Sequence, residues 1–398
     1  MVAPRRITIF TGTRAEYGLL RPLALRLQGF AEVELSWLVT GAHLSREHGY
    51  TVDEIDRDGF ARQERVEILG LDDGDAAIAG AMARGIEGFA HALKRLKTDI
   101  LVILGDRYEA LAAATAATIC RVPVAHIHGG ELSFGAMDDV FRHAITKMSH
   151  LHFASTEAYR RRIIQMGEHP ERVFHSGAPG VENALKLPLF SRAEVEARLG
   201  LSTGQPYVLA TFHPATLEAA SPAAQLAALI AVLRETTDAV AVFTGANADA
   251  HGRELNALLE AEATETPDRL RYFASLGSKM YLSAVRDAEF VIGNSSSGLI
   301  EVPSFGIPTV NIGSRQNGRT RADSVIDCAT DAGSIAAAVA RAQSEPFRAI
   351  AKSTVNPYGQ PETSATIARV LAQHPLDGLI TKGFYDLPLP AAQDGPYN

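Results

Sequence analysis

Cysteine is scarce in this chain, and other features that would point to particular function classes are missing too. The two cysteines, Cys120 and Cys328, form no CxxC pair, which argues against a zinc ribbon or a disulfide framework. No apolar run reaches the roughly 18 residues that a membrane-spanning helix needs. No block of like charges occurs, and the net charge of −8 argues against a nucleic-acid surface. The chain begins without a signal-peptide core, so we expect a cytoplasmic protein.

The composition that remains is that of an ordinary globular protein. Hydrophobic residues make up 46% of the chain and charged residues 21%. A length of 398 residues exceeds one ordinary core and predicts two domains of about 150–200 residues each.

Apolar runs of strand length alternate with helical stretches along most of the chain. Strands are predicted at 7–11, 33–39, 100–104, 122–127 and 151–154, and again at 207–212, 240–243, 290–292 and 307–312. Runs that are apolar on both faces indicate parallel sheets covered by helices, so the chain is predicted to be an α/β protein with two doubly wound domains. The predicted boundaries are a first domain at 1–185, a linker with a short helix at 186–205, a second domain at 206–375 and a C-terminal helix or tail at 376–398.

Two polar motifs follow predicted strands of the first domain. In TGTRAEYG, Gly12 permits a tight turn whose amides, with Arg14, can meet an anion. The alternative is a plain strand-to-helix turn. The fingerprint GxGxxG is absent, so a nicotinamide cofactor is not indicated. In GDRYE, Asp106 follows the strand at 100–104, where sites form in such sheets, although it could also cap the next helix.

The segment HIHGGE, with the residues after it, is the richest in chemistry. His126 and His128 are two apart on a predicted strand and so would share a face, but two histidines without further ligands argue against a metal. Glu131, Asp138 and Asp139 supply three carboxylates within nine residues, which suits acid–base work. The alternative is a solvated acidic loop. Against that alternative, the glycines 129–130 let the backbone approach a ligand closely.

Three loops of the second domain could bind phosphate. His213 follows the strand at 207–212 and could contact phosphate or act as an acid or base, or it could be a buried structural histidine. The serine-rich loop 293–298 leads into a helix that would carry Glu301 one turn along, so it could cradle a diphosphate or simply cap that helix. The basic loop 311–319 could clamp phosphates or be solvated.

Taken together, these segments resemble the UDP-N-acetylglucosamine 2-epimerase family, in particular its hydrolysing bacterial branch, which serves sialic-acid and legionaminic-acid synthesis. The resemblance is carried by TGTRAEYGLLRPL, LGDRYEAL, HIHGGE, DDVFRHAITKMSHLHF, TFHPAT, TGANAD, GNSSSGLIEVPSFGIPTVNIGSRQNGR and NPYGQPETS…FYDLP, and so covers nearly the whole chain. It implies a GT-B fold, in which two Rossmann-like domains face a central cleft and a C-terminal helix crosses back to the first domain. It also implies a homodimer or homotetramer.

The resemblance implies the site residues as well. The implied catalytic residues are Asp106, Glu131, Asp138 and His213. The residues implied to bind the UDP-sugar are Arg14, Arg107, Asp139, Arg142, Asn247, Tyr281, Ser295, Ser296, Glu301 and Arg315. No metal and no other cofactor is expected.

The implied reaction converts UDP-N-acetylglucosamine and water to UDP and N-acetylmannosamine, through elimination of UDP to a glycal and hydration of that glycal. Such chemistry needs cations and amides for the leaving diphosphate, and carboxylates to move protons. Four alternatives stay open: the same reaction on UDP-2,4-diacetamido-2,4,6-trideoxy-glucose, a non-hydrolysing epimerase, a UDP-sugar glycosyltransferase, and a nucleotide-sugar sensor without catalysis.

Overall fold

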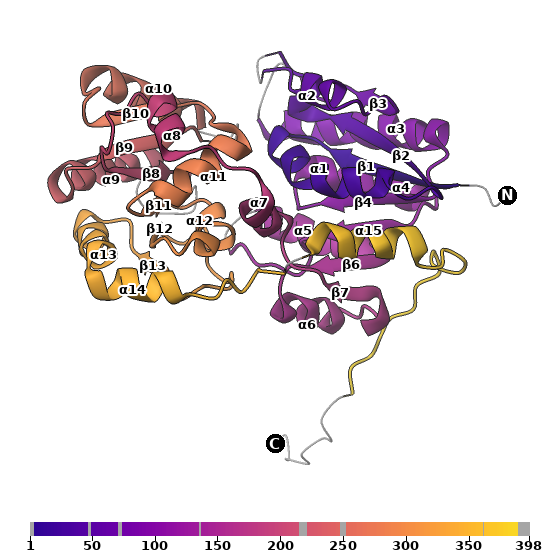
Figure 1. Cartoon of the computed structure of the whole chain (residues 1–398). Helices are drawn as coiled ribbons and strands as arrows, with labels where there is room; N and C mark the ends of the chain where they lie inside the picture. The colour runs from indigo at the N-terminus through magenta and orange to yellow at the C-terminus, as the bar shows by residue number, and fades with distance from the viewer. Residues whose placement is uncertain are drawn as a thin grey trace, which may run out of the picture.

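The chain forms two α/β units, each built on its own parallel sheet (Figure 1). The computed structural model describes residues 4–46, 49–70, 74–134, 137–214, 221–246, 252–360 and 362–388. Within these ranges no helix combines the length and the apolar character that crossing a bilayer requires.

The first sheet has seven strands in the order β3-β2-β1-β4-β5-β6-β7. Neighbouring strands are parallel, with Ile7 beside Ile100 and Leu101 beside Val124. The strand bounds are β1 Arg5–Thr11, β2 Val33–Thr40, β3 Gln63–Val66, β4 Ile100–Leu104, β5 Val124–Ile127, β6 Leu151–Ala154 and β7 Val173–His175.

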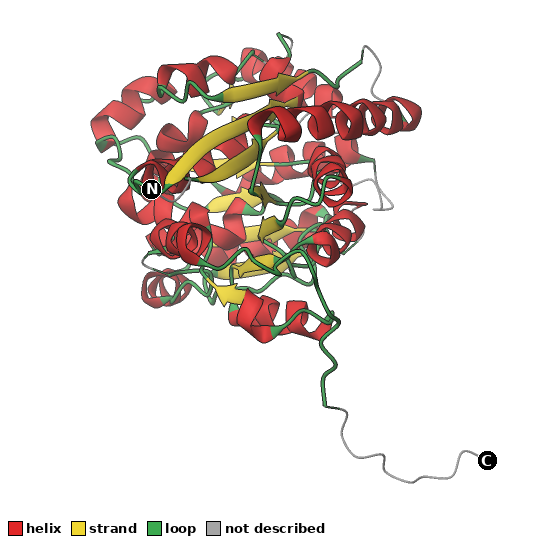
Figure 2. Cartoon of the chain, turned by 90° about the vertical axis from the view of Figure 1, so that its right-hand side faces the viewer, coloured by secondary structure: helices red, strands yellow, loops and turns green. Residues whose placement is uncertain are grey.

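Helices cover both faces of this sheet, as the yellow strands between red helices in Figure 2 show. One face packs on α3 and α4, where Phe89 and Ala113 share a core cluster with Leu101. The other face packs on α1, where Leu20 shares a cluster with Ile9. The bounds are α1 Arg14–Gln28, η1 Gly41–Leu44, α2 Val52–Arg57, α3 Asp75–Leu96, α4 Tyr108–Ile119, α5 Met137–Met148, α6 Glu157–Gln165 and η2 Pro170–Arg172.

The second sheet has six parallel strands in the order β10-β9-β8-β11-β12-β13. The helices α9, α10 and α13 cover one face, while α8 and α11 cover the other. The strands are β8 Tyr207–Thr211, β9 Val240–Thr244, β10 Leu270–Phe273, β11 Val291–Gly293, β12 Thr309–Ile312 and β13 Val325–Cys328. The helices are α9 Pro222–Thr236, α10 Gly252–Glu265, α11 Gly277–Asp287, α12 Ser297–Ile300, η3 Val302–Phe305, α13 Ala332–Gln343 and α14 Glu345–Ser353.

Both sheets reverse their strand order beside their first strand, between β1 and β4 and between β8 and β11. Loops that leave neighbouring strands in opposite directions open a crevice at the carboxyl ends, which is where doubly wound folds bind ligands. The prediction of two doubly wound domains is confirmed, and the reversal points place the expected site.

The segments that join the two units differ from the predicted boundaries. Helix α7 (Pro179–Lys186) lies between the units and packs on both α1 and η3 (Figure 1). Helix α8 (Arg192–Leu199), predicted as part of the linker, buries Val195 and Leu199 in the core of the second unit. Apolar burial therefore assigns this helix to the second domain.

The helix that returns to the first domain also lies earlier than predicted. Helix α15 (Thr363–Gln373) packs on α1 and buries Ile367 and Leu371 with the core of the first sheet (Figure 1). The predicted boundary at 375 falls after this helix, whereas the change of domain comes before it. Residues 376–388 form no helix, but Leu379 joins the same core and the Tyr385 amide donates to the Gly167 carbonyl at 2.9 Å.

Candidate active site

A buried arginine gathers the acidic residues at the carboxyl edge of the first sheet. The Arg142 side chain, on α5, is 1% exposed. Its Nη2 donates to Asp106, which follows β4, and to Ser133 Oγ at 3.0 Å. Its Nη1 donates to Asp139 Oδ1 and to the main-chain oxygen of Glu131, both at 3.0 Å. Residues that are separate in the sequence thus form one charged cluster.

Asp106 is not the cap of the helix that follows it. The N-cap residue of α4 is Arg107, and no side chain caps that helix. The Arg107 guanidinium lies 3.3 Å from Glu109 Oε2. Asp138 stands beside Asp139 in the first turn of α5 and is half-buried.

Glu131 is buried, and each of its oxygens has a partner. Oε1 accepts from His128 Nδ1 at 2.5 Å and from Ser155 Oγ at 2.7 Å. Oε2 lies 3.1 Å from Arg319 Nη1. Burial opposes ionisation, but His128, Arg319 and Arg142 together hold the pKa of Glu131 well below its usual range. The arrangement suits Glu131 to orienting its neighbours better than to exchanging protons.

The two histidines of HIHGGE do not share a face, contrary to the prediction. Strand β5 ends at Ile127, and His128 has φ 68°, in the left-handed region. The ring of His126 lies 2.8 Å from the Gly105 carbonyl and 3.2 Å from Thr146 Oγ1, and burial lowers its pKa to about 3. Over the described ranges, no group of three or more His, Cys, Asp and Glu is placed to hold a metal ion.

The glycines of this segment serve packing within the first domain. A Cβ on Gly129 would lie 2.9 Å from Thr146 Oγ1. A Cβ on Gly130, which has φ 75°, would lie 2.6 Å from the Tyr159 carbonyl. The close approach predicted for a ligand is therefore an approach to the neighbouring helices α5 and α6.

The turn after β1 differs from the predicted anion site. Glu16 Oε2 accepts the Gly12 amide at 2.7 Å, so a side chain of the same turn occupies that amide. Burial raises the pKa of Glu16 to about 7. Arg14 pairs with Glu54 at 2.8 Å and reaches Ser275 Oγ of the second domain at 3.5 Å. Arg14 therefore lies where the two domains meet.

In the second domain, Asn294 ties together the loops that carry His213 and Arg315. Its side chain accepts from the His213 amide at 2.7 Å and donates to the His213 carbonyl at 2.8 Å. Its own carbonyl accepts from Arg315 at 3.1 Å and from Gln316 at 2.8 Å. Burial, with a contribution from Arg315, lowers the pKa of His213 to about 3, so its imidazole is neutral. Sequence reasoning did not single out Asn294, although its place directly after β11 was the available signal.

The serine-rich loop caps its helix through Ser295, whose Oγ accepts the amide of Ser297, the first residue of α12 (Ser297–Ile300), at 3.4 Å. Ser295 and Ser296 follow β11, and Ser296 is the N-cap residue of α12 without a side-chain cap bond. Glu301 ends this four-residue helix instead of lying one turn along it. The Glu301 Oε1 packs against Gly180 so closely that a Cβ there would collide with it, and the buried Oε2 of Glu301 has no hydrogen-bond partner in the described part of the chain. Burial raises the pKa of Glu301 and of Tyr281 on α11.

The carboxyl ends of the two sheets meet through the loop between β12 and β13. Arg319 pairs with Glu131, as described, and its Nη2 donates to Ser133 Oγ at 3.3 Å. The Thr320 amide donates to the Tyr159 hydroxyl at 2.8 Å. The predicted sugar side and the predicted phosphate side therefore adjoin. Arg319 was missed as a site residue because only the loop 311–319 as a whole was recognised. Asn247, also predicted to bind the UDP-sugar, lies outside the described residues.

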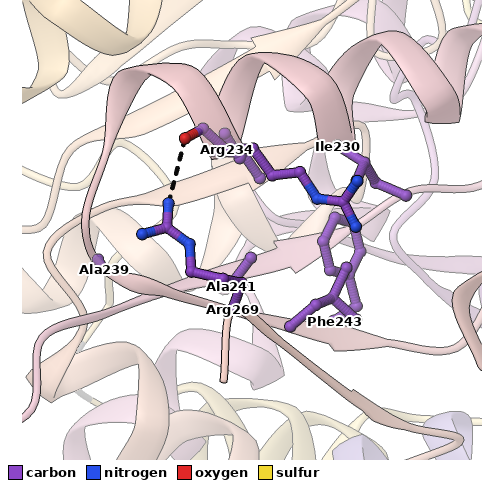
Figure 3. A pocket seen from close by; sticks show the side chains of 8 residues that line it. Ile230, Arg234, Ala239, Ala241, Phe243 and Arg269 are labelled. Carbon is purple, nitrogen blue, oxygen red and sulfur yellow. Dashed lines mark hydrogen bonds between the residues drawn. The ribbon is translucent and has the colours of Figure 1, made fainter. Parts of the chain in front are cut away.

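A small cavity elsewhere in the second domain is unrelated to this site. It lies between α9 and the amino ends of β9 and β10 and is lined mainly by apolar residues such as Ile230, Ala239 and Phe243 (Figure 3). Arg269 bridges it by donating to the Arg234 carbonyl at 3.2 Å. Because the reversal point of the sheet is at the opposite ends of the strands, we regard this cavity as a packing gap.

Comparison with known proteins places the chain in a family. Residues 25–372 match the family model described as UDP-N-acetylglucosamine 2-epimerase. A relative from Campylobacter jejuni, named GDP/UDP-N,N'-diacetylbacillosamine 2-epimerase (hydrolyzing), is 38% identical over 82% of this chain and 85% of its own. Polysialic acid biosynthesis protein P7 from Escherichia coli is 36% identical over 96% of this chain and 98% of its own. The UDP-N,N'-diacetylbacillosamine 2-epimerase (hydrolyzing) from Legionella pneumophila is 35% identical over 94% of this chain and 98% of its own.

Solved structures agree on the fold. The crystal structure of the UDP-GlcNAc 2-epimerase from Neisseria meningitidis bound to UDP-GlcNAc superposes with a TM-score of 0.77 at 17% identity, covering 92% of this chain and 99% of that chain. With the two parallel-sheet domains, this likeness confirms the expected GT-B fold. Since the family model spans most of the chain and relatives above 30% identity cover it almost completely, the chain belongs to the UDP-N-acetylglucosamine 2-epimerase family.

Proposed function

We propose that the chain is a hydrolysing 2-epimerase, which takes a UDP-activated 2-acetamido sugar and water, inverts C2 and releases UDP and the free sugar. The observation that carries the proposal is that Arg319, from the loop that also carries Arg315, pairs with Glu131 and bonds to Ser133 beside the acidic cluster around Arg142. Two relatives whose names specify hydrolysing 2-epimerases support it, at 38% and 35% identity.

The two sides of this site match the two demands of the reaction. In the elimination, the C2–H bond and the C1–O bond break, the C2–H electrons form the C1=C2 bond, and UDP leaves with the C1–O electrons. In the hydration, the C1=C2 electron pair bonds a proton at C2 on the other face, a water oxygen bonds to C1, and that water gives up one of its protons to a base. Arg14 and Arg315 are proposed to stabilise the diphosphate, Asp106 and Asp138 to serve proton transfers, and Glu131 to hold the groups beside it in position.

His213 is proposed to meet the diphosphate as a neutral hydrogen-bond donor. Its pKa of about 3 means that it carries no charge near neutral pH before the substrate arrives. A bound diphosphate would raise that pKa, because a nearby anion favours the protonated ring. Glu301, whose buried Oε2 lacks a partner in the described ranges, is proposed to accept from the ribose hydroxyls.

Of the two substrates, we propose the diacetamido sugar as the first candidate. The relatives from C. jejuni and L. pneumophila are named for N,N'-diacetylbacillosamine, which is 2,4-diacetamido-2,4,6-trideoxy-glucose. UDP-N-acetylglucosamine is the second candidate, because a relative from N. meningitidis named UDP-N-acetylglucosamine 2-epimerase is 31% identical over 81% of the chain. A cytoplasmic homodimer or homotetramer belongs to the same proposal, and light scattering of the purified protein tests the assembly.

Proton NMR in deuterated water tests the reaction and the substrate together. Each UDP-sugar is incubated separately with the purified protein. Release of UDP with a free, C2-deuterated manno-configured sugar is the expected result, faster from the diacetamido substrate. Accumulation of a UDP-linked epimer would instead assign the non-hydrolysing reaction. UDP-sugar consumption only when an acceptor sugar is added would assign a glycosyltransferase, and binding without turnover would assign a sensor.

A further inference from the structure

Three buried side chains form one connected chain of hydrogen bonds and ion pairs across the domain interface. Glu131 is in the middle, with His128 Nδ1 at 2.5 Å on one oxygen and Arg319 Nη1 at 3.1 Å on the other. The exposed side-chain fractions are 11% for His128, 2% for Glu131 and 11% for Arg319. Two members follow β5 of the first domain, and the third comes from the loop after β12 of the second.

Glu131 determines which nitrogen of His128 carries the proton. Its pKa is held well below the usual range, as described above, so the carboxylate is ionised near neutral pH and can only accept hydrogen bonds. Whenever the imidazole carries a single proton, that proton therefore resides on Nδ1, where it is donated to Glu131. This leaves Nε2 with a lone pair, which is the form that a general base requires.

The backbone at His128 shows that this position is held under strain. Its φ of 68° lies in the left-handed region, which non-glycine residues seldom adopt. Such strain persists only where the surroundings enforce it, and it is concentrated at functional sites. The imidazole is also within electrostatic range of the second domain. Burial raises the pKa of the Glu301 carboxyl, and His128 and Arg319 are among the groups that partly oppose this rise. His128 thus lies between the acidic cluster and a residue proposed to bind the ribose.

We propose that His128 is the catalytic base that removes the C2 proton, and that Glu131 and Arg319 are positioning residues. In this step the C2–H bond breaks and its proton bonds to His128 Nε2. The electron pair of that bond forms C1=C2, and the C1–O pair leaves with UDP. The proton that later reaches C2 comes to the opposite face and therefore from another acid. Glu131 orients the imidazole and stabilises the imidazolium that forms.

Arg319 makes this arrangement depend on both domains. Its loop is docked on the first domain by the bond from the Thr320 amide to Tyr159, and the Tyr358 hydroxyl donates to the Thr320 carbonyl at 3.0 Å. The guanidinium can hold Glu131 only when this loop is in place. The alignment of the base therefore depends on the contact between the two domains.

The test is His128→Asn in the full chain. Asparagine tolerates the left-handed backbone better than most residues, and its amide can replace Nδ1–H as a donor to Glu131, but it has no basic nitrogen. UDP affinity is expected to stay within about threefold of wild type, because the pair with Glu131 survives. Deuterium incorporation at C2 and UDP release are expected to fall about 10²- to 10⁴-fold, the usual contribution of a general base. His91→Asn, at an exposed position on α3, is the matched control and should keep full activity.

The variant Glu131→Gln distinguishes the role of the base from that of the residue that positions it. This variant should lose less activity than His128→Asn, because a glutamine oxygen can still accept from Nδ1. A His128→Asn protein that binds UDP and retains C2 exchange within tenfold of wild type overturns the proposal. The proposal is also overturned if Glu131→Gln loses as much activity as His128→Asn, or more. If His128→Asn fails to bind UDP, His128→Gln decides by the same criterion. Because this role for His128 presupposes the proposed function, the wild-type reaction is run in parallel, and absence of C2 exchange there would refute the proposed function itself.

Discussion

Replacing Arg142 by methionine should destabilise the first domain by about 3 kcal/mol. The guanidinium is 1% exposed and serves four acceptors, two of them carboxylates. Breaking a buried ion pair by removing one partner costs roughly 3–5 kcal/mol, because the remaining charge is left without compensation. The side chains of Asp106 and Asp139 are 21% and 22% exposed, so water can screen them and the lower end applies. Methionine fills most of the vacated volume, which limits any cavity cost.

Urea unfolding followed by tryptophan fluorescence measures this change in the correct domain. Trp37 is the only tryptophan of the chain and is fully buried in β2, so its emission reports the first domain. A domain-specific probe matters because a two-domain protein need not unfold in one step. The control is Arg65→Met, which removes an ion pair with Asp56 whose side chains are 38% and 41% exposed, and should cost less than about 1 kcal/mol. If the midpoint for Arg142→Met fell no further than that of the control, the organising role of Arg142 would be refuted.

Three further changes test other parts of the structure. Asn294→Ala removes both hydrogen bonds to the His213 backbone, worth about 1 kcal/mol each, and should weaken UDP binding measured by calorimetry; an unchanged Kd would contradict this. Gly130→Ala places a Cβ 2.6 Å from the Tyr159 carbonyl at φ 75° and should cost roughly 1–3 kcal/mol in thermal unfolding, so an unchanged Tm would count against the packing argument. Burial opposes ionisation of Glu168, but a buried histidine and two lysines lower its pKa from 4.5 to about 2, so it stabilises the fold fully above about pH 4.5 and progressively less toward pH 2. The stability difference between wild type and Glu168→Gln should shrink across that window, and a difference independent of pH would disprove the coupling.

The central strands could be predicted from the sequence because burial on both faces requires a continuous apolar run. Strands 100–104 and 151–154 have the predicted bounds, and the other predicted strands differ by a few residues. The four strands that were not predicted, β3, β7, β10 and β13, are the four edge strands of the two sheets. Segments such as QERV and LRYF are partly exposed and carry charged residues, so no apolar run distinguishes them from loops. Their strand character comes from pairing with a neighbour that only the fold supplies.

The position of the site could also be predicted, but the partners of its residues could not. Asp106, Glu131 and His213 each follow a predicted strand, and parallel topology brings the carboxyl ends of strands to one edge. Sequence alone could not show that Arg142 binds Asp106 or that Arg319 reaches Glu131 from the other domain, because these contacts join distant segments. The shared face expected for the two histidines failed because β5 ends one residue before His128, and side-chain direction in a strand depends on that register.

Thus the sequence by itself determined the fold class, the order of the buried strands along the chain and the candidate loops at their carboxyl ends, because each depends on local apolar pattern and turn residues. The tertiary structure decided to which domains α8 and α15 belong. It also decided which residues neutralise the buried carboxylates, and which histidine donates its Nδ1 proton to a carboxylate. An amphipathic helix can bury its apolar face on any matching surface, and a buried charge can pair with any opposite charge that reaches it. Only the folded chain determines which surface and which charge are within reach.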